Sequence, residues 1–355
     1  MKTLHVTLGN QLFPVSLLQK HFSPESFEVF MAEDRELCTF YRFHKLKLVL
    51  YLSAMRHHRD SLRKAGFRVH YYALNDEKWF AASYEDKLQS CLNQHSFDRL
   101  SVFEVEDRFM EQRLVKWSQG QKLSLEWVRS PMFLTSRLDF AKIFENQRPS
   151  MAVFYKRQRQ NMSVLLNPDG GPKGGRWSFD QENRKRLPSS VQPPEPHWVA
   201  PDALTKKVMQ EVAAQFPGHP GDVENFQYPV TREDALRALD RFVCERLESF
   251  GDYQDAITPD HDFVFHSVIS PSLNLGLLLP GEVVAKTEAQ MTSLGLPLNS
   301  VEGFLRQVMG WREFVRGIYH QYHHRLYSEN FWNHKRPLQN SWYEASTGIP
   351  PLDDS

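Results

Sequence analysis

The sequence predicts a fold of two parts, an α/β domain with a mainly parallel sheet followed by an all-α region. The first third of the chain alternates short β-rich runs with longer segments of helical periodicity. This alternation predicts parallel strands covered by helices on both faces, in a Rossmann-like arrangement. Beyond Asp202 the strand-like runs stop, and apolar residues recur at helical spacing from Ala235 to Leu247. A chain of 355 residues is long enough for two such cores.

Five short runs rich in β-branched, aromatic and aliphatic residues predict the strands. They span residues 4–8, 27–31, 68–72, 100–105 and 123–128. The longest helical pattern between them covers residues 40–64. We therefore assign residues 1–135 to the α/β domain, and we expect its ligands to bind beyond the carboxyl ends of the strands.

Polar residues follow three of these strands. Gly9 and Asn10 come after the first, Glu33 and Asp34 after the second, and Glu106 after the fourth. Turn formation and helix N-capping are one interpretation, and hydrogen bonding to the hydroxyl groups of a ligand is the other. No glycine-rich phosphate fingerprint follows a strand, which disfavours a nicotinamide cofactor.

Residues 136–201 are predicted to connect the two parts without a core of their own, because periodicity weakens and Pro and Gly accumulate. Eight basic residues outnumber three acidic ones between Lys156 and Arg186, and aromatic residues interleave with them. This mixture predicts contacts with the phosphates and unstacked bases of DNA, and a solvated basic linker is the alternative. Arg157 and Arg176 are the candidate backbone contacts.

Residues 202–355 are predicted to be helical, with Thr231 as the N-cap of one helix. Within them, residues 299–319 carry the strongest functional signal. Their apolar residues recur at steps of three and four, which predicts a helix that buries one face. That face comprises Phe304, Val308, Trp311, Val315, Ile318 and Tyr322.

The same segment carries residues that a buried helix does not need. Gln307 precedes Trp311 by one turn, and Arg312 precedes Arg316 by one turn. An amide beside an indole, with two guanidinium groups on another face, suits a planar anionic ligand. A core helix with solvated arginines is the alternative.

Two hydroxyl groups, from Ser267 and Ser270, lie ahead of Pro271 at the predicted start of a helix. Unpaired backbone N–H groups and the helix dipole favour a phosphate at such a position. Serine capping without a ligand is the simpler interpretation.

Composition sets outer limits on function. The chain has 43 basic and 43 acidic residues, which argues against a generally cationic nucleic-acid binder, so any DNA contact is expected to be a local patch. Three widely spaced cysteines predict free thiols in a reducing cytoplasm and no metal site. No leader and no apolar run of membrane-spanning length is present, so we expect a cytoplasmic protein without membrane association.

The order FGDYQDAITPDHDFVFHSVISPSLNLGLLLPGEV, then PLNSVEGFLRQVMGWREFVRGIY, resembles the first half of the flavin-binding helical domain of photolyases and cryptochromes. Upstream blocks such as SPMFLTSR, FYKRQR and GGRWSFDQENRKRLP extend the resemblance over nearly the whole chain. The likeness is strongest to the bacterial deoxyribodipyrimidine photolyase-related branch, which is (6-4) photolyase-like and holds an iron-sulfur cluster.

The resemblance implies light-dependent repair of UV pyrimidine photoproducts in DNA, by electron transfer from reduced FAD. It also implies a lyase-type enzyme with an antenna chromophore, a ribityl lumazine, at Gly9, Asn10, Glu33, Asp34 and Glu106. Trp311 is expected to face the lesion or line the cavity, and the catalytic residues stay unassigned. His266 stands where relatives usually have threonine. The residues expected to bind the flavin are Tyr253, His266, Ser267, Ser270, Asn274, Gln307 and Arg312.

The family continues through further helices beyond the point that corresponds to Ser355. A histidine-rich helix and the four cysteines of the iron-sulfur cluster lie there. We therefore expect an incomplete helical domain, no iron-sulfur cluster and doubtful tight flavin binding by this chain alone. A cryptochrome-like blue-light receptor and an inactive truncated remnant are the alternatives. The pair His323 and His324 is expected at a solvated helix end, and no protein partner is evident.

Overall fold

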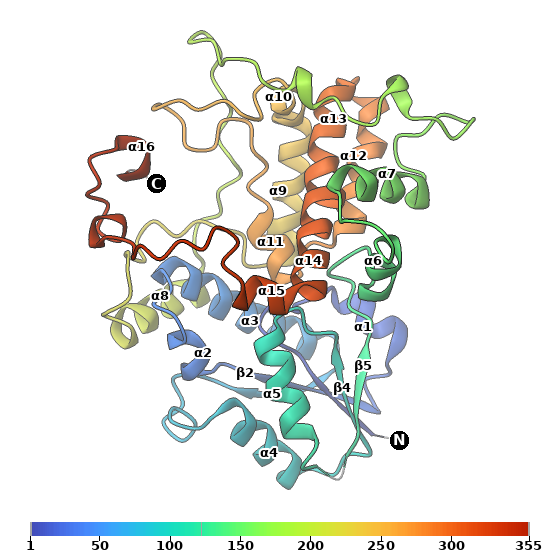
Figure 1. Cartoon of the computed structure of the whole chain (residues 1–355). Coiled ribbons are helices and arrows are strands. Elements are labelled where there is room, and N and C mark those ends of the chain that lie inside the picture. Colours follow the sequence, from blue (N-terminus) through green and yellow to red (C-terminus); the bar gives the residue numbers. More distant parts are fainter. Residues whose placement is uncertain (1, 122, 354–355) are drawn as a thin grey trace.

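The computed structural model describes residues 2–121 and 123–353 (Figure 1). Its first part is a five-stranded, fully parallel sheet with the strand order β3-β2-β1-β4-β5. The strands are β1 (Thr3–Val6), β2 (Phe27–Ala32), β3 (Arg68–Tyr72), β4 (Arg99–Phe103) and β5 (Leu125–Val128). The predicted α/β class and all five strands are confirmed, with end points that differ by a few residues.

Both faces of the sheet are buried, as parallel strands require. Along β2, Phe27, Val29 and Met31 enter one hydrophobic cluster, while Phe30 and Ala32 enter another. This alternation follows the two-residue period of a strand. The covering helices are α1 (Val15–His21), α2 (Arg35–Thr39), α3 (Lys45–Lys64), α4 (Tyr84–Gln94) and α5 (Arg108–Ser118).

The connection contributes to a small aromatic cluster that it shares with α14 (Arg312–Gln321), which was not predicted from the sequence. The helices of the connection are α6 (Arg137–Ile143) and α7 (Met151–Met162), followed by the short turns η1 (Lys173–Gly175) and η2 (Asp180–Glu182). Phe140, Phe144 and Phe154 are buried together and pack against Phe314 of the helical part. The cluster forms because each short helix buries one aromatic face, a pattern that the surrounding Pro and Gly residues obscured.

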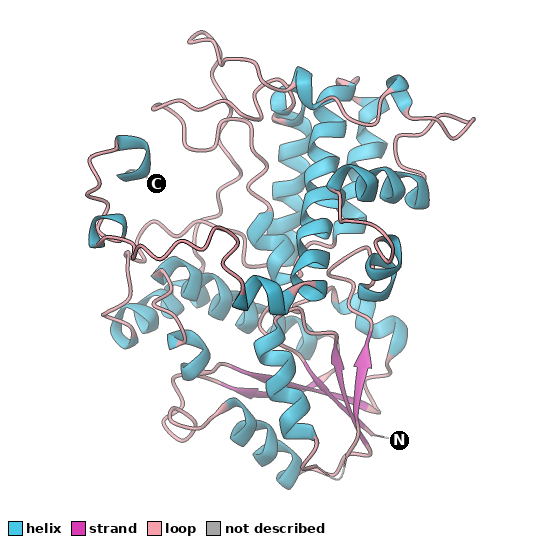
Figure 2. Ribbon diagram, viewed as in Figure 1, coloured by secondary structure: helices cyan, strands magenta, loops and turns pink. Residues whose placement is uncertain are grey.

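Beyond Asp202 the described regular elements are all helices, as predicted, and long loops connect some of them (Figure 2). Thr231 is confirmed as an N-cap, because its hydroxyl oxygen accepts a hydrogen bond from Asp234 N. The principal helices are α8 (Ala203–Gln215), α9 (Arg232–Glu245), α10 (Leu247–Phe250), α11 (Ser270–Leu275), α12 (Pro280–Ser293), α13 (Leu298–Leu305) and α14 (Arg312–Gln321).

The last described segment extends away from these helices (Figure 1). It comprises α15 (His323–Ser328), η4 (Asn340–Trp342) and α16 (Pro350–Asp353). His324 is exposed, where α14 gives way to α15. No helix within residues 2–121 and 123–353 is long and apolar enough to cross a membrane.

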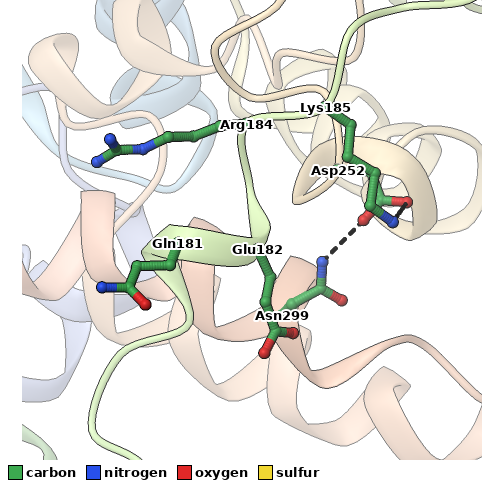
Figure 3. A pocket seen from close by; sticks show the side chains of 6 residues that line it. All are labelled: Gln181, Glu182, Arg184, Lys185, Asp252 and Asn299. Carbon is green, nitrogen blue, oxygen red and sulfur yellow. Dashed lines mark hydrogen bonds and ion pairs between the residues drawn. The ribbon is translucent and has the colours of Figure 1, made fainter.

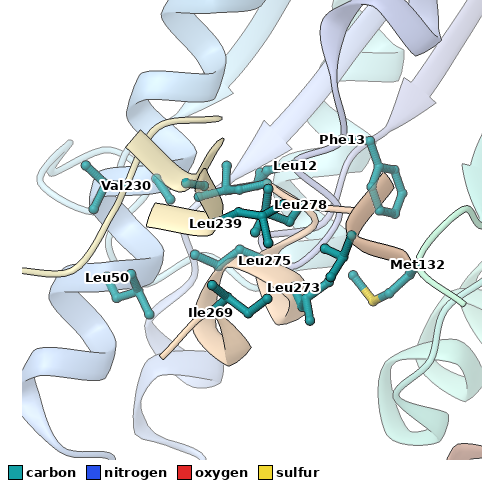
Figure 4. Close-up of a cluster of buried hydrophobic side chains, with 14 of the residues drawn as sticks. Leu12, Phe13, Leu50, Met132, Val230, Leu239, Ile269, Leu273, Leu275 and Leu278 are labelled. Atoms are coloured by element: carbon teal, nitrogen blue, oxygen red, sulfur yellow. The ribbon is translucent and has the colours of Figure 1, made fainter. Parts of the chain in front are cut away.

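One hydrophobic core joins the two parts of the molecule (Figure 4). Leu12 and Phe13, which follow β1, pack with Leu273, Leu275 and Leu278 around α11. The backbone reinforces the contact, because Leu12 N donates to Leu275 O at 2.9 Å. The carboxyl ends of the strands are thereby fixed against the helices, and each predicted site has a defined position.

Candidate functional site

A π-helical turn, Arg306–Trp311, interrupts the segment with the strongest functional signal. It inserts between α13 and α14 and shifts the helical register, so the predicted apolar face is wrong at Trp311 and Val315, whereas Ile318 is half-buried and packs against the cluster around Phe140. Phe304 and Val308 are buried, but Trp311 is 43% exposed and Val315 is 58% exposed. After the turn the buried positions are Glu313, Arg316 and Gly317 instead.

The register shift points charged residues of α14 at the carboxyl edge of the sheet. Arg316 forms a two-pronged ion pair with Glu106, at 2.7 Å and 2.9 Å, and donates to Thr135 O at 3.0 Å. His320 Nε2 lies 2.9 Å from the same carboxylate. Burial opposes ionisation of Glu106, but the hydrogen bonds from His320 and Arg316 outweigh it and lower its pKa to about 2. We call Glu106, Arg316 and His320 the clasp.

Glu313 anchors the same helix to the loop after β5. Its buried carboxylate accepts hydrogen bonds from Leu134 N and Thr135 N at 3.0 Å. Burial raises the pKa of Glu313 to about 7, against the effect of these N–H donors. The side chain therefore serves as a support for residues 130–135.

Arg312 and Arg316 share a face, as predicted, and both lie over the ring of Phe133, at 4.0 Å and 5.0 Å from its centre. Arg312 Nη1 donates to Met132 O at 2.8 Å. Its Nη2 is buried and has no hydrogen-bond partner among the described residues. Arg312 thus lies against the loop of the α/β part and keeps one free donor.

The acidic residues at the end of β2 are occupied by internal partners. Glu33 is 1% exposed and accepts hydrogen bonds from both Nε and Nη2 of Arg56, from Tyr71 Oη and from Leu74 N. Asp34 accepts from Leu37 N and pairs with Lys87 Nζ at 3.0 Å. The capping interpretation is confirmed for Asp34, and a ligand hydroxyl at Glu33 would have to compete with these donors.

Gly9 and Asn10 are only half-buried and lie beside α3. A side chain at Gly9 would approach Met55 Sδ to 3.0 Å and Tyr51 Cδ1 to 3.7 Å. Glycine therefore leaves space at the carboxyl end of β1 that any other residue would fill. Of the predicted antenna residues, these two keep the most open surroundings.

Of the residues predicted to hold a flavin, Tyr253, His266 and Ser267 lie on the loop between α10 and α11, and Ser270 and Asn274 lie on α11 itself. His266, Ser270 and Asn274 are exposed, while Tyr253 and Ser267 are half-buried. The ring of Tyr253 stacks on Phe265, with centroids 5.5 Å apart. We call these five residues, together with Gln307, the wall.

Gly303 of α13 is the point where the wall meets the helix. A side chain there would clash with Asn183 and come within 3.3 Å of Gln254 Oε1. Gln307 donates to Gly303 O at 3.3 Å, and the ring of His266 packs edge-on against Phe250. Gln254 Oε1 is buried without a hydrogen-bond partner among the described residues. The loop after α10 therefore packs against α13 at Gly303, with the acceptor of Gln254 left unsatisfied among the described residues.

A polar pocket of about 350 Å³ lies next to this junction, between the connection and α13 (Figure 3). Lys185 Nζ pairs with Asp252 Oδ2 at 2.7 Å, and Asn299 Nδ2 donates to Asp252 Oδ1 at 3.0 Å. These contacts hold the residue before Tyr253. The two acidic and two basic residues of the pocket compensate one another in charge. We therefore assign the pocket the role of positioning the loop around Asp252.

The basic connection divides into structural and exposed residues. Arg159 is fully buried and donates to the carbonyl groups of Val164, Leu165 and Trp177, so it is not available for DNA. Arg157 is exposed, and Arg176 is exposed with its guanidinium over Phe179 and hydrogen-bonded to Glu182. The local patch is therefore smaller than the sequence indicates.

No group of three or more His, Cys, Asp or Glu residues is arranged to hold a metal ion in the part of the chain that the structure describes. The thiols of Cys38, Cys91 and Cys244 are free. The absence of an iron-sulfur cluster stays a prediction.

Comparison with known proteins identifies the family. Residues 5–228 match the deoxyribodipyrimidine photo-lyase-related protein family. The chain belongs to this family. It is 32% identical over 349 residues to a (6-4) photolyase from Agrobacterium fabrum, which covers 98% of the chain and 68% of that relative. The predicted family is thus confirmed.

Solved structures of the photolyase and cryptochrome fold agree. A bacterial class III photolyase from Agrobacterium tumefaciens superposes with a TM-score of 0.61 at 16% identity, over 99% of this chain and 67% of that structure. A cryptochrome from Synechocystis sp. PCC6803 gives a TM-score of 0.62 at 15% identity, over 99% and 69%. At these identities the likeness supports the fold alone.

Proposed function

We propose that this photolyase-related chain acts in the light-dependent repair of UV pyrimidine photoproducts in DNA. The observation that carries the proposal is its 32% identity to a (6-4) photolyase over 98% of the chain. The parallel sheet, the helical part and the exposed wall are consistent with it.

The wall supplies groups that suit one side of FAD. Hydroxyl, amide, phenol and imidazole groups reach the surface there, and Gln254 Oε1 and Arg312 Nη2 are buried without partners among the described residues. A bound ligand or an ordered water satisfies such atoms. When bound and reduced, the flavin supplies the electron for photorepair, while the protein binds and orients it.

Substrate DNA would lie against the exposed indole of Trp311, with Arg157 and Arg176 on its phosphates. Trp311 offers 43% of its surface, enough for one unstacked base. Arg157 carries an exposed charge, and Arg176 is already held rigidly by Phe179 and Glu182. A small patch on a chain of zero net charge favours local contact over general DNA affinity.

We also propose the carboxyl edge of the sheet as the antenna site, with Gly9 and Asn10 as the direct contacts for a ribityl lumazine. Glu33, Asp34 and Glu106 then hold the surrounding elements through their internal partners. Their hydrogen bonds fix α2, α3 and α14 around the space beside Gly9.

An absorption spectrum of the purified chain, before and after denaturation, tests chromophore binding. A flavin spectrum, followed by blue-light conversion of an oligonucleotide with a (6-4) photoproduct, supports repair. Bound flavin without conversion favours a cryptochrome-like receptor. Absence of chromophore and of affinity for damaged DNA favours an inactive remnant and contradicts the proposal.

A further inference from the structure

A second pocket, of about 270 Å³, lies where the α/β part meets the helical part. We propose that it binds a small, uncharged heteroaromatic molecule. The lining comes from the residues after β1, from the second half of α3, and from the entry to α9. These residues are Leu12, Phe13, Pro14, Val15, Ser16, His57, His58, Ser61, Val230, Thr231, Arg232 and Leu277.

The pocket has an apolar floor and a polar mouth. Leu12, Phe13, Val230 and Leu277 are buried, and they form the floor. Ser16 and Ser61 are exposed and mark the mouth. A largely apolar cavity with few polar groups at a domain boundary is the usual form of a small-molecule site.

His58 carries the argument for a ligand. Its side chain lines the pocket and is 7% exposed, yet Nε2 has no hydrogen-bond partner among the described residues. Burial lowers the pKa of His58 to about 4, so the ring is neutral near pH 7. A buried nitrogen left unpaired costs free energy that a ligand atom in the pocket would recover.

The charged groups around the pocket are already paired, which favours an uncharged ligand over a charged one. Arg232 is the one arginine in the lining described, and its guanidinium is occupied by both oxygens of Glu282 and by Leu277 O. His57 Nε2 lies 3.3 Å from Asp202 Oδ2. None of the lining residues that the structure describes is acidic. A charged ligand would therefore lose its hydration without gaining a free counter-charge.

Size narrows the ligand class. A volume of this size equals about nine water molecules in the liquid, which corresponds to a bicyclic ring. The ring would lie on the apolar floor and direct one nitrogen edge at His58. None of the residues proposed for the antenna, the flavin or DNA lines this pocket, so the inference stands apart from the proposed function.

The test uses the full chain, in the dark, at pH 7.5, with two bicyclic probes of similar size. Indole carries an N–H donor and quinoline carries an acceptor nitrogen, so the better probe also reports the tautomer of His58. Calorimetry and saturation-transfer NMR measure binding. We expect one probe to bind at least about tenfold more tightly than the other, because a mismatched polar edge leaves Nε2 unpaired.

Two variants locate the site. Ser61→Trp blocks the exposed mouth and should abolish binding, whereas Ser293→Trp, on an exposed serine at the end of α12, should not change it. His58→Phe should remove the preference between the probes. If neither probe binds, or if binding survives Ser61→Trp, the inference is wrong. Circular dichroism establishes that each variant is folded, and the Ser61→Trp result decides the matter if His58→Phe is not.

Discussion

The clasp and the wall both consist of polar residues at the ends of secondary structure elements, yet their environments are opposite. In the clasp, Arg316 is buried, the side chain of Glu106 is 12% exposed, and the two satisfy each other. In the wall, His266, Ser270 and Asn274 are exposed. Position at an element end therefore does not distinguish a structural residue from a binding residue. The distinction comes from partners far away in the chain, because Arg316 follows Glu106 by 210 residues.

The largest effect is expected from removal of the arginine of the clasp, which tests whether the clasp stabilises the fold. Arg316→Met should lower the free energy of unfolding by about 3–5 kcal/mol, because it leaves the carboxylate of Glu106, whose side chain is only 12% exposed, without its main partner. Urea denaturation at pH 7 measures the loss. Arg237→Met, which removes an exposed ion pair on α9, should cost less than about 1 kcal/mol. Equal losses in the two variants would show that the clasp is not structural.

The pH dependence of stability tests whether the clasp depends on the ionised carboxylate of Glu106. The pKa of Glu106 is about 2 in the folded chain, below its ordinary value of 4.5, so its stabilisation is complete above about pH 5 and is lost as the pH falls toward 2. The expected loss is about 2–3 kcal/mol. Denaturation between pH 2 and pH 6 should show a shallower acid limb in Glu106→Gln than in the wild type. An unchanged limb would contradict the assigned shift.

The wall and the exposed indole of Trp311, which lies outside it, should behave in the reverse way, with effects on ligands and little effect on stability. Trp311→Ala should weaken binding to DNA with a UV photoproduct by about 1–3 kcal/mol, the usual contribution of one stacked base. Its free energy of unfolding should change by less than about 1 kcal/mol because the indole is 43% exposed. Fluorescence anisotropy at fixed salt measures the affinity. Trp342→Ala, in the exposed last segment, is the matched control and should leave DNA binding unchanged.

The smallest effect is expected at a single amide of the wall. Asn274→Ala should weaken flavin binding by about 0.5–1.5 kcal/mol, the contribution of one hydrogen bond. Equilibrium dialysis with FAD measures it, and the exposed Asn93→Ala on α4 serves as the control. Equal affinity in both variants would remove Asn274 from the proposed site.

Local patterns predicted most of the fold. The five strands, the helix predicted over residues 40–64 and the Thr231 cap follow from periodicity and capping chemistry, which act over a few residues, although the helix begins only at Lys45. The π-helical turn could not be predicted this way, because a fixed helical period assumes that no residue is inserted. Because of it, Trp311 is 43% exposed although it was expected on the buried face, and Glu313 is buried in its place.

The candidate site was less predictable than the fold. The family resemblance selected the wall residues, but it gave no indication that Glu33 and Glu106 would be held by Arg56 and Arg316. Such pairs depend on the packing of whole elements. The aromatic cluster of Phe140, Phe144 and Phe154 could have been predicted from the sequence, because these phenylalanines lie in or directly after two short helical segments.

The extra residue in the Arg306–Trp311 turn rotates α14 about the helix axis relative to α13. Each residue advances an α-helix by about 100°, so deleting one residue in the turn would rotate everything after it by that angle. Arg316 and His320 would swing away from Glu106, and the indole of Trp311 would turn out of its present orientation. The π-helical turn thus determines both the contact of α14 with Glu106 of the α/β domain and the exposure of Trp311.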